Sequence, residues 1–227
     1  MQLPVTIGTE TEIRECTLRA DIWCRAGTYD EFVVREIIPT YGWMPVACRR
    51  VMDIGGNIGA FAAWAASAGA EHVVTVEPEL SNYRTLLENT RQHERIEALR
   101  AMVGSETMLG AGEIWLSPTG KNPGNTSSVH MRGRTGQTGI DILGFMDIME
   151  EYEPEVLKID VEGAEYDFLT SPLPDHVRYL TMEIHLSRPV WRQEKGPAVA
   201  ALFSSWECVR APKFEGGHWN TIGAWKR

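Results

Sequence analysis

Six polar side chains with useful chemistry follow apolar runs of this sequence. A carboxylate can hold a cation or accept hydrogen bonds from hydroxyl groups, and an imidazole exchanges a proton near neutral pH. If the apolar runs are parallel strands, the residues after them meet at the carboxyl edge of one sheet, where ligands of open α/β sheets bind. The pattern predicts a site for binding and acid–base chemistry formed by Asp53, Glu77, Asp160, Glu162, Glu183 and His185.

The first of these residues precedes a glycine-rich turn. Asp53 ends an apolar run and is followed by Gly55, Gly56 and Asn57, before Gly59 opens an alanine-rich stretch. Glycines there permit a sharp bend and bring a nucleotide-type ligand close to the backbone. A carboxylate before the turn suits a cation better than a pyrophosphate. Because S-adenosylmethionine joins a nucleoside to a cationic amino-acid tail, the turn favours this cofactor over a dinucleotide.

The next two strand ends complete a predicted nucleoside pocket. Glu77 ends the apolar run 72–77, and an acidic residue about 20 positions after a glycine turn typically accepts hydrogen bonds from ribose hydroxyls. A third strand is expected over 96–103. The adenine ring would lie at its end, beside Met102 and Val103, although both side chains suit a plain core position equally well.

Catalytic candidates follow the later strands. Methyl transfer is an in-line displacement, so the protein must position both reactants and remove a proton from the acceptor. His185 is the first candidate base because its ordinary pKa lies near neutrality, and Asp160 and Glu162 are the next candidates. A structural hydrogen-bonding role is the alternative for His185. The same carboxylates with Glu183 and His185 could hold a divalent cation, but no metal site is predicted, because sequence does not show that they converge.

The elements that would carry these residues alternate between strand and helix. This alternation predicts a mainly parallel sheet with helices on both faces. Two final runs with a glycine turn between them predict a closing antiparallel hairpin. Strands are expected over 50–54, 72–77, 96–103, 156–161, 179–185, 207–211 and 220–225, and helices over 58–68, 79–92, 140–152, 166–169 and 191–206.

Two segments lie outside this alternation. Residues 1–45 are expected to form a cap or lid, with a helix over 29–38 that Pro39 ends. The stretch 117–139 is rich in Gly, Ser, Thr, Asn and Pro. A loop of this length is either a functional element, here a substrate lid, or a disordered surface loop, and both interpretations stay open.

Composition limits the class of protein. The 227 residues suit a single domain, with residues 46–227 as its core, and 43% hydrophobic residues are enough for a sizeable interior. A net charge of −9, with no long basic run, argues against a nucleic-acid partner and leaves a small-molecule acceptor. No apolar run reaches membrane-spanning length, and no leader pattern opens the chain. The cysteines lack metal-type spacing, so we expect free thiols in a reducing cytoplasm at Cys16, Cys24, Cys48 and Cys208.

Three of these runs resemble the FkbM family of class I S-adenosylmethionine-dependent methyltransferases. They are V-M-D-I-G-G-N-I-G at 51–59, V-E-P-E at 76–79 and, most specifically, K-I-D-V-E-G-A-E at 158–165. The resemblance implies a Rossmann-like seven-stranded fold and O-methylation of a hydroxyl on a secondary metabolite or sugar. It assigns residues 53–57 to the methionine tail, Glu77 to the ribose, and Asp160 with Glu162 to the mouth of the active site.

Three other functions remain open at this point. A cluster of carboxylates could hold a cationic acceptor, which would make the protein an N-methyltransferase of an amine or guanidine. A protein that binds the nucleoside without turnover is a second alternative, although mere binding does not require the polar groups that follow the later strands. A dinucleotide-dependent dehydrogenase fits least, because the complete G-x-G-x-x-G pattern is missing.

Overall fold

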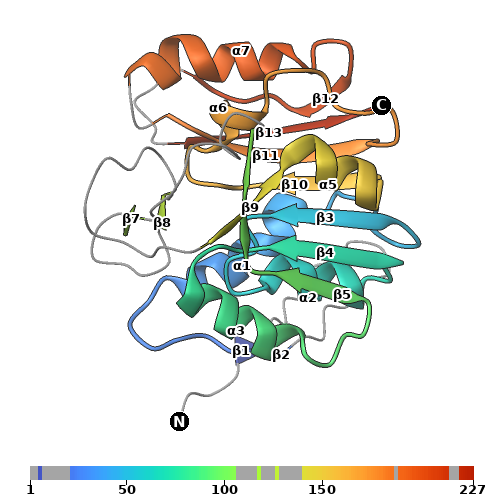
Figure 1. The fold of residues 1–227 in the computed structure, drawn as a ribbon, viewed down its shortest axis with the longest axis vertical. Coiled ribbons are helices and arrows are strands. Elements are labelled where there is room, and N and C mark those ends of the chain that lie inside the picture. Colours follow the sequence, from blue (N-terminus) through green and yellow to red (C-terminus); the bar gives the residue numbers. More distant parts are fainter. Residues whose placement is uncertain are drawn as a thin grey trace.

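A seven-stranded sheet forms the centre of the protein (Figure 1). The computed structural model describes residues 5–6, 21–105, 117–118, 126–127, 140–186, 189–214 and 220–227. The strand order is β12-β13-β11-β10-β3-β4-β5. Strands β11, β10, β3, β4 and β5 run parallel, and β13 is antiparallel to both β11 and β12. The strands are β3 (Arg50–Ile54), β4 (His72–Val76), β5 (Ile96–Leu99), β10 (Val156–Ile159), β11 (Tyr179–His185), β12 (Glu207–Arg210) and β13 (Asn220–Lys226).

Helices cover both faces of this sheet because side chains alternate along its strands. On one face Val51 and Val73 pack with α1 and α2. On the other face Met52 and Ile54 pack with α5, α6 and α7. The predicted fold class, a Rossmann-like sheet with a closing antiparallel hairpin, is therefore confirmed. The helices are α1 (Asp30–Tyr41), α2 (Ala60–Ser67), α3 (Leu80–Thr90), α5 (Phe145–Tyr152), α6 (Glu165–Phe168) and α7 (Gly196–Ala201), with a π-helix η1 (Trp191–Lys195) before α7.

Two predicted elements are divided differently in the structure. The strand expected over 96–103 is two strands, β5 and β6 (Ala101–Gly104), which belong to different sheets. The helix expected over 140–152 begins with a strand, β9 (Asp141–Gly144), and only its second part is helical, as α5. Parallel pairing of β9 with β6 overrides the helical spacing, and Gly144 marks the change.

Helix α1 also departs from the prediction, because it continues through Pro39. A proline inside a helix removes one backbone donor, but this one lies in the last turn, where few hydrogen bonds remain to be lost. Burial of Tyr41 favours the extra turn, since its ring packs edge-on against Phe61 at 5.2 Å between centroids. The Gly42 N–H donates to the Ile38 carbonyl at 2.9 Å and closes the helix.

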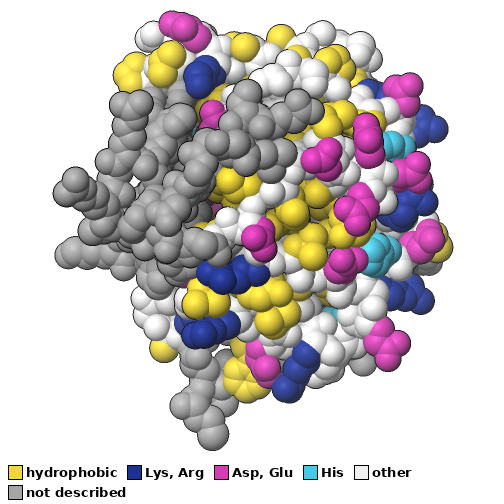
Figure 2. Space-filling view, in the orientation of Figure 1, with side chains coloured by type: hydrophobic (Ala, Val, Ile, Leu, Met, Phe, Trp, Pro, Cys, Tyr) yellow, Lys and Arg dark blue, Asp and Glu magenta, His cyan; other side chains and the backbone are white. Residues whose placement is uncertain are grey.

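The remaining short strands lie outside the central sheet. The pair β1 (Val5–Thr6) and β2 (Asp21–Ile22) and the pair β7 (Ser117–Pro118) and β8 (Thr126–Ser127) are both antiparallel. Most of the predicted loop 117–139 lies outside the described residues, and its role as a lid stays a prediction. On the face drawn in Figure 2, basic and acidic side chains are interspersed over the coloured residues. None of the described helices combines the length and apolar character needed to cross a bilayer.

Candidate active site

The turn after β3 is closed against the loop after β10. Gly55 has a φ of 87°, and a Cβ there would lie 1.7 Å from the Asp160 carbonyl oxygen, so only glycine fits. The N–H groups of Gly55 and Gly56 both donate to the Val76 carbonyl, at 3.0 and 2.9 Å. Three strand ends thus meet at one glycine, and the chain turns directly into α2.

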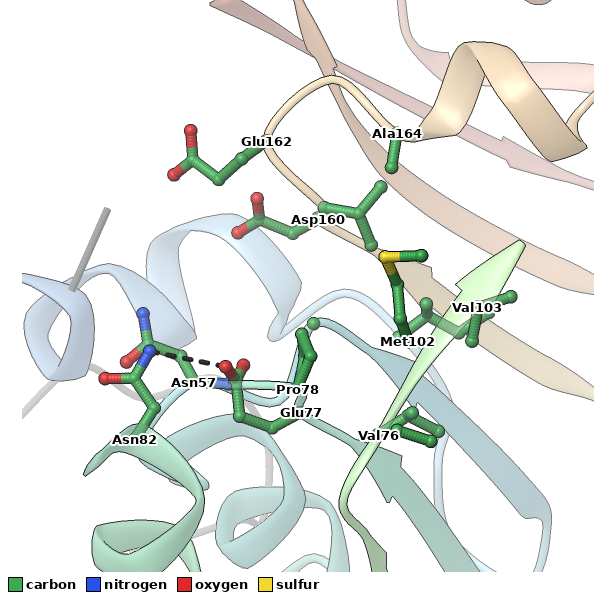
Figure 3. A pocket seen from close by; sticks show the side chains of 14 residues that line it. Asn57, Val76, Glu77, Pro78, Asn82, Met102, Val103, Asp160, Glu162 and Ala164 are labelled. Carbon is green, nitrogen blue, oxygen red and sulfur yellow. Dashed lines mark hydrogen bonds between the residues drawn. The ribbon is translucent and has the colours of Figure 1, made fainter. Parts of the chain in front are cut away.

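A pocket opens at these strand ends (Figure 3). The empty space in it, counted together with the part open to solvent, is about 600 Å³. Two of its residues, Asn57 and Glu162, hold left-handed backbone conformations with φ of 49° and 54°. Such conformations in non-glycine residues collect at functional sites. The lining residues are Ile54, Gly55, Asn57, Val76, Glu77, Pro78, Asn82, Ala101, Met102, Val103, Asp160, Val161, Glu162 and Ala164.

Glu77 is held by backbone donors at one end of this pocket. Its carboxylate accepts hydrogen bonds from the N–H of Asn57 at 2.8 Å and from the N–H of Glu79 at 2.9 Å. The Asn82 amide lies 3.4 Å away (Figure 3). Burial raises the pKa of Glu77 to about 7, although the backbone donors oppose this rise. The side chain is therefore oriented, and its charge responds to pH near neutrality.

The structure gives Asp53 a different partner from the one predicted. Its carboxylate has no exposure to solvent and does not line the pocket. The Lys158 ammonium lies 3.0 Å from Asp53 Oδ1, close enough for an ion pair though not aligned for a hydrogen bond, and donates to the Gly55 carbonyl at 2.6 Å. Thr75 donates to the other carboxylate oxygen at 2.9 Å. We therefore correct the role of Asp53: it supports the turn from behind, because its charge is met by a buried lysine.

Gly56 also lies behind the pocket wall. A Cβ there would meet the Thr75 hydroxyl at 2.2 Å and Leu86 of α3 at 2.8 Å. Its glycine character therefore serves the packing of α3 against the turn. Asn57, Glu77, Met102, Val103 and Asp160, by contrast, all lie on the lining, where the sequence placed the cofactor.

A segment before α1 is attached to the pocket through α3. The Arg25 guanidinium donates to both oxygens of Asp30, to the Ser81 hydroxyl and to the Asn82 side-chain carbonyl, at 2.8 to 2.9 Å. Asn82 in turn contacts Glu77. No local pattern indicates this anchor, because Arg25 lies more than 50 positions before Ser81 and Asn82. The lid role of residues 1–45 stays a prediction.

The other end of the site is a cluster of carboxylates around one imidazole. His185 Nε2 lies 3.2 Å from Glu162 Oε2 and 3.9 Å from Glu183 Oε1, and Nδ1 lies 3.3 Å from Glu165 Oε1. Glu165 has no exposure, and its carboxylate also accepts the N–H groups of Gly163 and His185, both at 2.8 Å. The structure thus brings His185 and Glu162 together, with the predicted residue Asp160 beside Glu183.

This arrangement argues against His185 as the free base. Although burial opposes its charge, the carboxylates of Glu165, Glu162 and Glu183 raise the pKa of His185 well above its ordinary value. A protonated imidazole has no lone pair with which to accept a proton, and His185 does not line the pocket. Burial, together with Asp160, raises the pKa of Glu183 to about 8. The candidate bases that lie on the pocket wall are therefore Asp160 and Glu162.

Three partners in this site escaped the sequence analysis: Lys158, Glu165 and Asn82. Lys158 and Glu165 lie on either side of Asp160 in the run 158–165. Their place in this short charged motif is the sequence feature that could have indicated a role in the site. Their partners are set by strand register and by the packing of α6, which no local pattern shows.

The pocket suits a nucleoside with an amino-acid tail. Asn57 lines the pocket, and its buried Oδ1 makes no hydrogen bond to any described residue. Glu77 offers a carboxylate for ribose hydroxyls. Met102, Val103 and Val76 supply an apolar slot for a flat base (Figure 3). These residues fit S-adenosylmethionine without any contribution from Asp53.

Comparison with known proteins gives one family. Residues 53–207 match the family described as methyltransferase FkbM domain. None of the curated proteins matches the chain.

Similar solved structures are distant in sequence. The C-terminal domain of precorrin-6Y C5,15-methyltransferase from Rhodobacter capsulatus is 14% identical, with 89% of this chain and 92% of that chain covered and a TM-score of 0.46. Precorrin-6y C5,15-methyltransferase from Geobacter metallireducens is 10% identical, with 90% and 92% covered and a TM-score of 0.46. Aeropyrum pernix fibrillarin with bound S-adenosyl-L-methionine is 13% identical, with 86% and 74% covered and a TM-score of 0.44.

Proposed function

We propose that this chain, which belongs to the FkbM methyltransferase family, methylates a hydroxyl group of a small polar metabolite or natural-product intermediate. The family makes it an S-adenosylmethionine-dependent methyltransferase, so a nucleoside-binding protein without turnover is no longer an alternative. The choice of a hydroxyl acceptor is the proposal. The net charge of −9 supports a small molecule over a nucleic acid as the second substrate.

The main observation behind the proposal is that one pocket has a nucleoside-binding end and an acidic end. Asn57 and Glu77 line one end, and Asp160 and Glu162 line the other. In Figure 3 the two acidic side chains extend from the loop after β10, across the opening from Glu77. A carboxylate beside the reacting end of a nucleoside pocket can accept the proton that a hydroxyl loses on methylation.

The chain's own residues then have distinct tasks. When bound, S-adenosylmethionine supplies an electrophilic methyl group on its sulfonium. The turn at Gly55 and Asn57 orients the cofactor, and Val161 with Ala164 excludes water beside it. Glu162 accepts the acceptor's proton as the new carbon–oxygen bond forms and the sulfur–carbon bond breaks. His185, held between carboxylates, positions Glu162.

An acceptor screen tests this proposal. Purified protein is supplied with tritiated S-adenosylmethionine and separate pools of sugars and polyols, hydroxy acids and phenols, and amines and guanidines. We expect label in a hydroxyl pool, with a methyl ether identified by NMR. Glu162→Gln should lower the turnover by about 100-fold or more, while the affinity for S-adenosylhomocysteine is unchanged. Label in the amine pool alone would refute the hydroxyl acceptor.

A second candidate, N-methylation of an amine or guanidine, is favoured by the acidity of the same mouth. The carboxylates there are Asp160, Glu162 and Glu183. Glu36 of α1 is close to them, since burial and the charge of Asp160 raise the pKa of Glu36. Carboxylates in this number would attract a cationic acceptor. For such a substrate, Glu162→Gln should abolish acceptor binding without removing a pH-dependent rate step.

A further inference from the structure

Asp160, Glu183 and His185 converge at the ends of two neighbouring strands. β10 and β11 are parallel and in register, with Ile159 beside Met182, so the residues that follow lie side by side. Glu183 and His185 are two positions apart on one strand and point to the same face. One ligand atom from each of Asp160, Glu183 and His185 lies within 4.8 Å of the others. Two carboxylates and an imidazole therefore face one small volume.

A buried carboxylate behind the imidazole distinguishes this group from a mere acidic patch. Glu165 has no exposure, and backbone N–H groups fix its two oxygens. With the Nδ1 hydrogen donated to Glu165, the Nε2 atom of His185 is directed at the carboxylates of Glu162 and Glu183. Metal-binding histidines almost always donate their second ring N–H in this way to a carboxylate or carbonyl. His185 itself is 7% exposed, so this orientation is imposed by the core.

We propose that Asp160, Glu183 and His185 bind a divalent metal ion at the mouth of the pocket. Carboxylate oxygens with one imidazole nitrogen suit cations such as Mn²⁺, Mg²⁺ or Zn²⁺. A metal-bound imidazole is neutral, so binding of the ion would release the proton that the surrounding carboxylates favour on His185. Glu162 Oε2 lies 3.2 Å from His185 Nε2, next to this site.

A bound metal ion would explain why several carboxylates lie at the mouth of the pocket. This part of the inference rests on the proposed O-methylation. Negative charge that develops on an acceptor oxygen beside Asp160, Glu162 and Glu183 would be repelled by those carboxylates. A divalent cation among them reverses the local field and lowers the pKa of a neighbouring hydroxyl. The proton passes to Glu162, and the methyl group moves from sulfur to oxygen, which leaves S-adenosylhomocysteine.

Metal binding can be measured without any acceptor. Untagged protein is treated with EDTA, desalted and titrated with Mn²⁺, and the free ion is followed by its electron paramagnetic resonance signal. We expect one Mn²⁺ to bind per chain. Asp160→Asn and Glu183→Gln should abolish this binding, and Glu165→Gln should weaken it by about 10- to 100-fold, as for other residues behind a metal ligand.

The controls separate binding from folding and from function. Glu207→Gln removes an exposed carboxylate on β12 and should bind Mn²⁺ as the wild type does. Thermal melting and S-adenosylhomocysteine affinity show that each variant is folded. Absence of Mn²⁺ binding in the folded wild type, or binding that survives both Asp160→Asn and Glu183→Gln, would overturn the metal site. Stoichiometric binding by a protein that methylates only amines would instead retain the site and refute the hydroxyl acceptor.

Discussion

Replacement of Lys158 by methionine should destabilise the fold far more than loss of a surface cation. The ammonium and the Asp53 carboxylate lie 3.0 Å apart, at 5% and 0% side-chain exposure. At an effective dielectric constant of about 20, their attraction is about 5.5 kcal/mol. Methionine fills the same space between the Tyr41 and Phe61 rings but leaves the carboxylate buried without a cation. Breaking a buried pair from one side costs about 3 to 5 kcal/mol.

Urea unfolding of a double-mutant cycle measures this cost. Lys158→Met alone should lower the free energy of unfolding by about 3 to 5 kcal/mol, or the Tm by roughly 6 to 20 °C. Asp53→Asn in the same chain should recover up to about 3 kcal/mol, since the charge left behind is removed. Lys226→Met, which breaks the exposed pair with Glu207, is the matched control and should cost less than about 1 kcal/mol.

The same cycle decides the role of Asp53. Because Asp53 is buried and does not line the pocket, Asp53→Asn should change stability and leave the affinity for S-adenosylhomocysteine almost unaltered. A large loss of affinity with unchanged stability would show that Asp53 faces the ligand, as the sequence had predicted. A cost below about 1 kcal/mol for Lys158→Met would refute the buried pair itself.

Three further perturbations test other parts of the site. Gly55→Ala should abolish S-adenosylhomocysteine binding or folding, because the added Cβ would overlap the Asp160 carbonyl. Gly27 also has a positive φ, but a Cβ added there would meet no atom within 4 Å. As the control, Gly27→Ala should therefore lower the free energy of unfolding by only about 1 to 2 kcal/mol in an unfolding titration. The affinity for S-adenosylhomocysteine, measured by calorimetry, should weaken about tenfold from pH 8 to pH 6. Glu77 has a pKa of about 7, and its protonation removes an acceptor for ribose hydroxyls. Glu77→Gln should therefore make the affinity nearly independent of pH over this range. Arg25→Ala should raise the KM for S-adenosylmethionine with kcat little changed, whereas Arg35→Ala, from an exposed helix pair, should leave both constants unchanged.

The parts of the site that sequence predicted are local. The strand, glycine turn and helix around Gly55 occupy about a dozen consecutive residues, and glycine at 55 and 59 permits the positive φ found at both positions. Glu77 could be placed because the crossover between consecutive parallel strands has a nearly fixed length. The closing hairpin of β12 and β13 was also visible, since two short apolar runs flank a glycine turn.

The parts that sequence did not predict depend on register. Asp53 lies beside Lys158 because β3 pairs with β10, whose residues are about a hundred positions later. From the sequence alone, a carboxylate at a strand end could bind a cofactor or form an ion pair with another side chain, and nothing distinguishes the two roles. His185 has the same ambiguity: its type suggested a base, and only the approach of Glu165 and Glu162 shows that both ring nitrogens face carboxylates.

Errors in the elements have a similar origin. Residues 140–152 carry apolar side chains at helical spacing, yet Asp141–Gly144 forms a strand because β6 offers a parallel partner. Pro39 is tolerated because burial of Tyr41 outweighs a hydrogen bond lost in the last turn. In both cases a tertiary contact decided between local alternatives of similar energy.

The segment 158–165 joins the two halves of the site. Lys158 neutralises Asp53 behind the glycine turn, the Asp160 carbonyl abuts Gly55, and Glu165 holds His185. Eight residues thus couple the shape of the cofactor pocket to the carboxylate cluster at its mouth. A chain that kept Lys158 without an acid at position 53 would bury an unpaired ammonium, and one that kept Asp53 alone would bury an unpaired carboxylate. The two residues should therefore be exchanged together or not at all, even though they lie in separate motifs of the sequence.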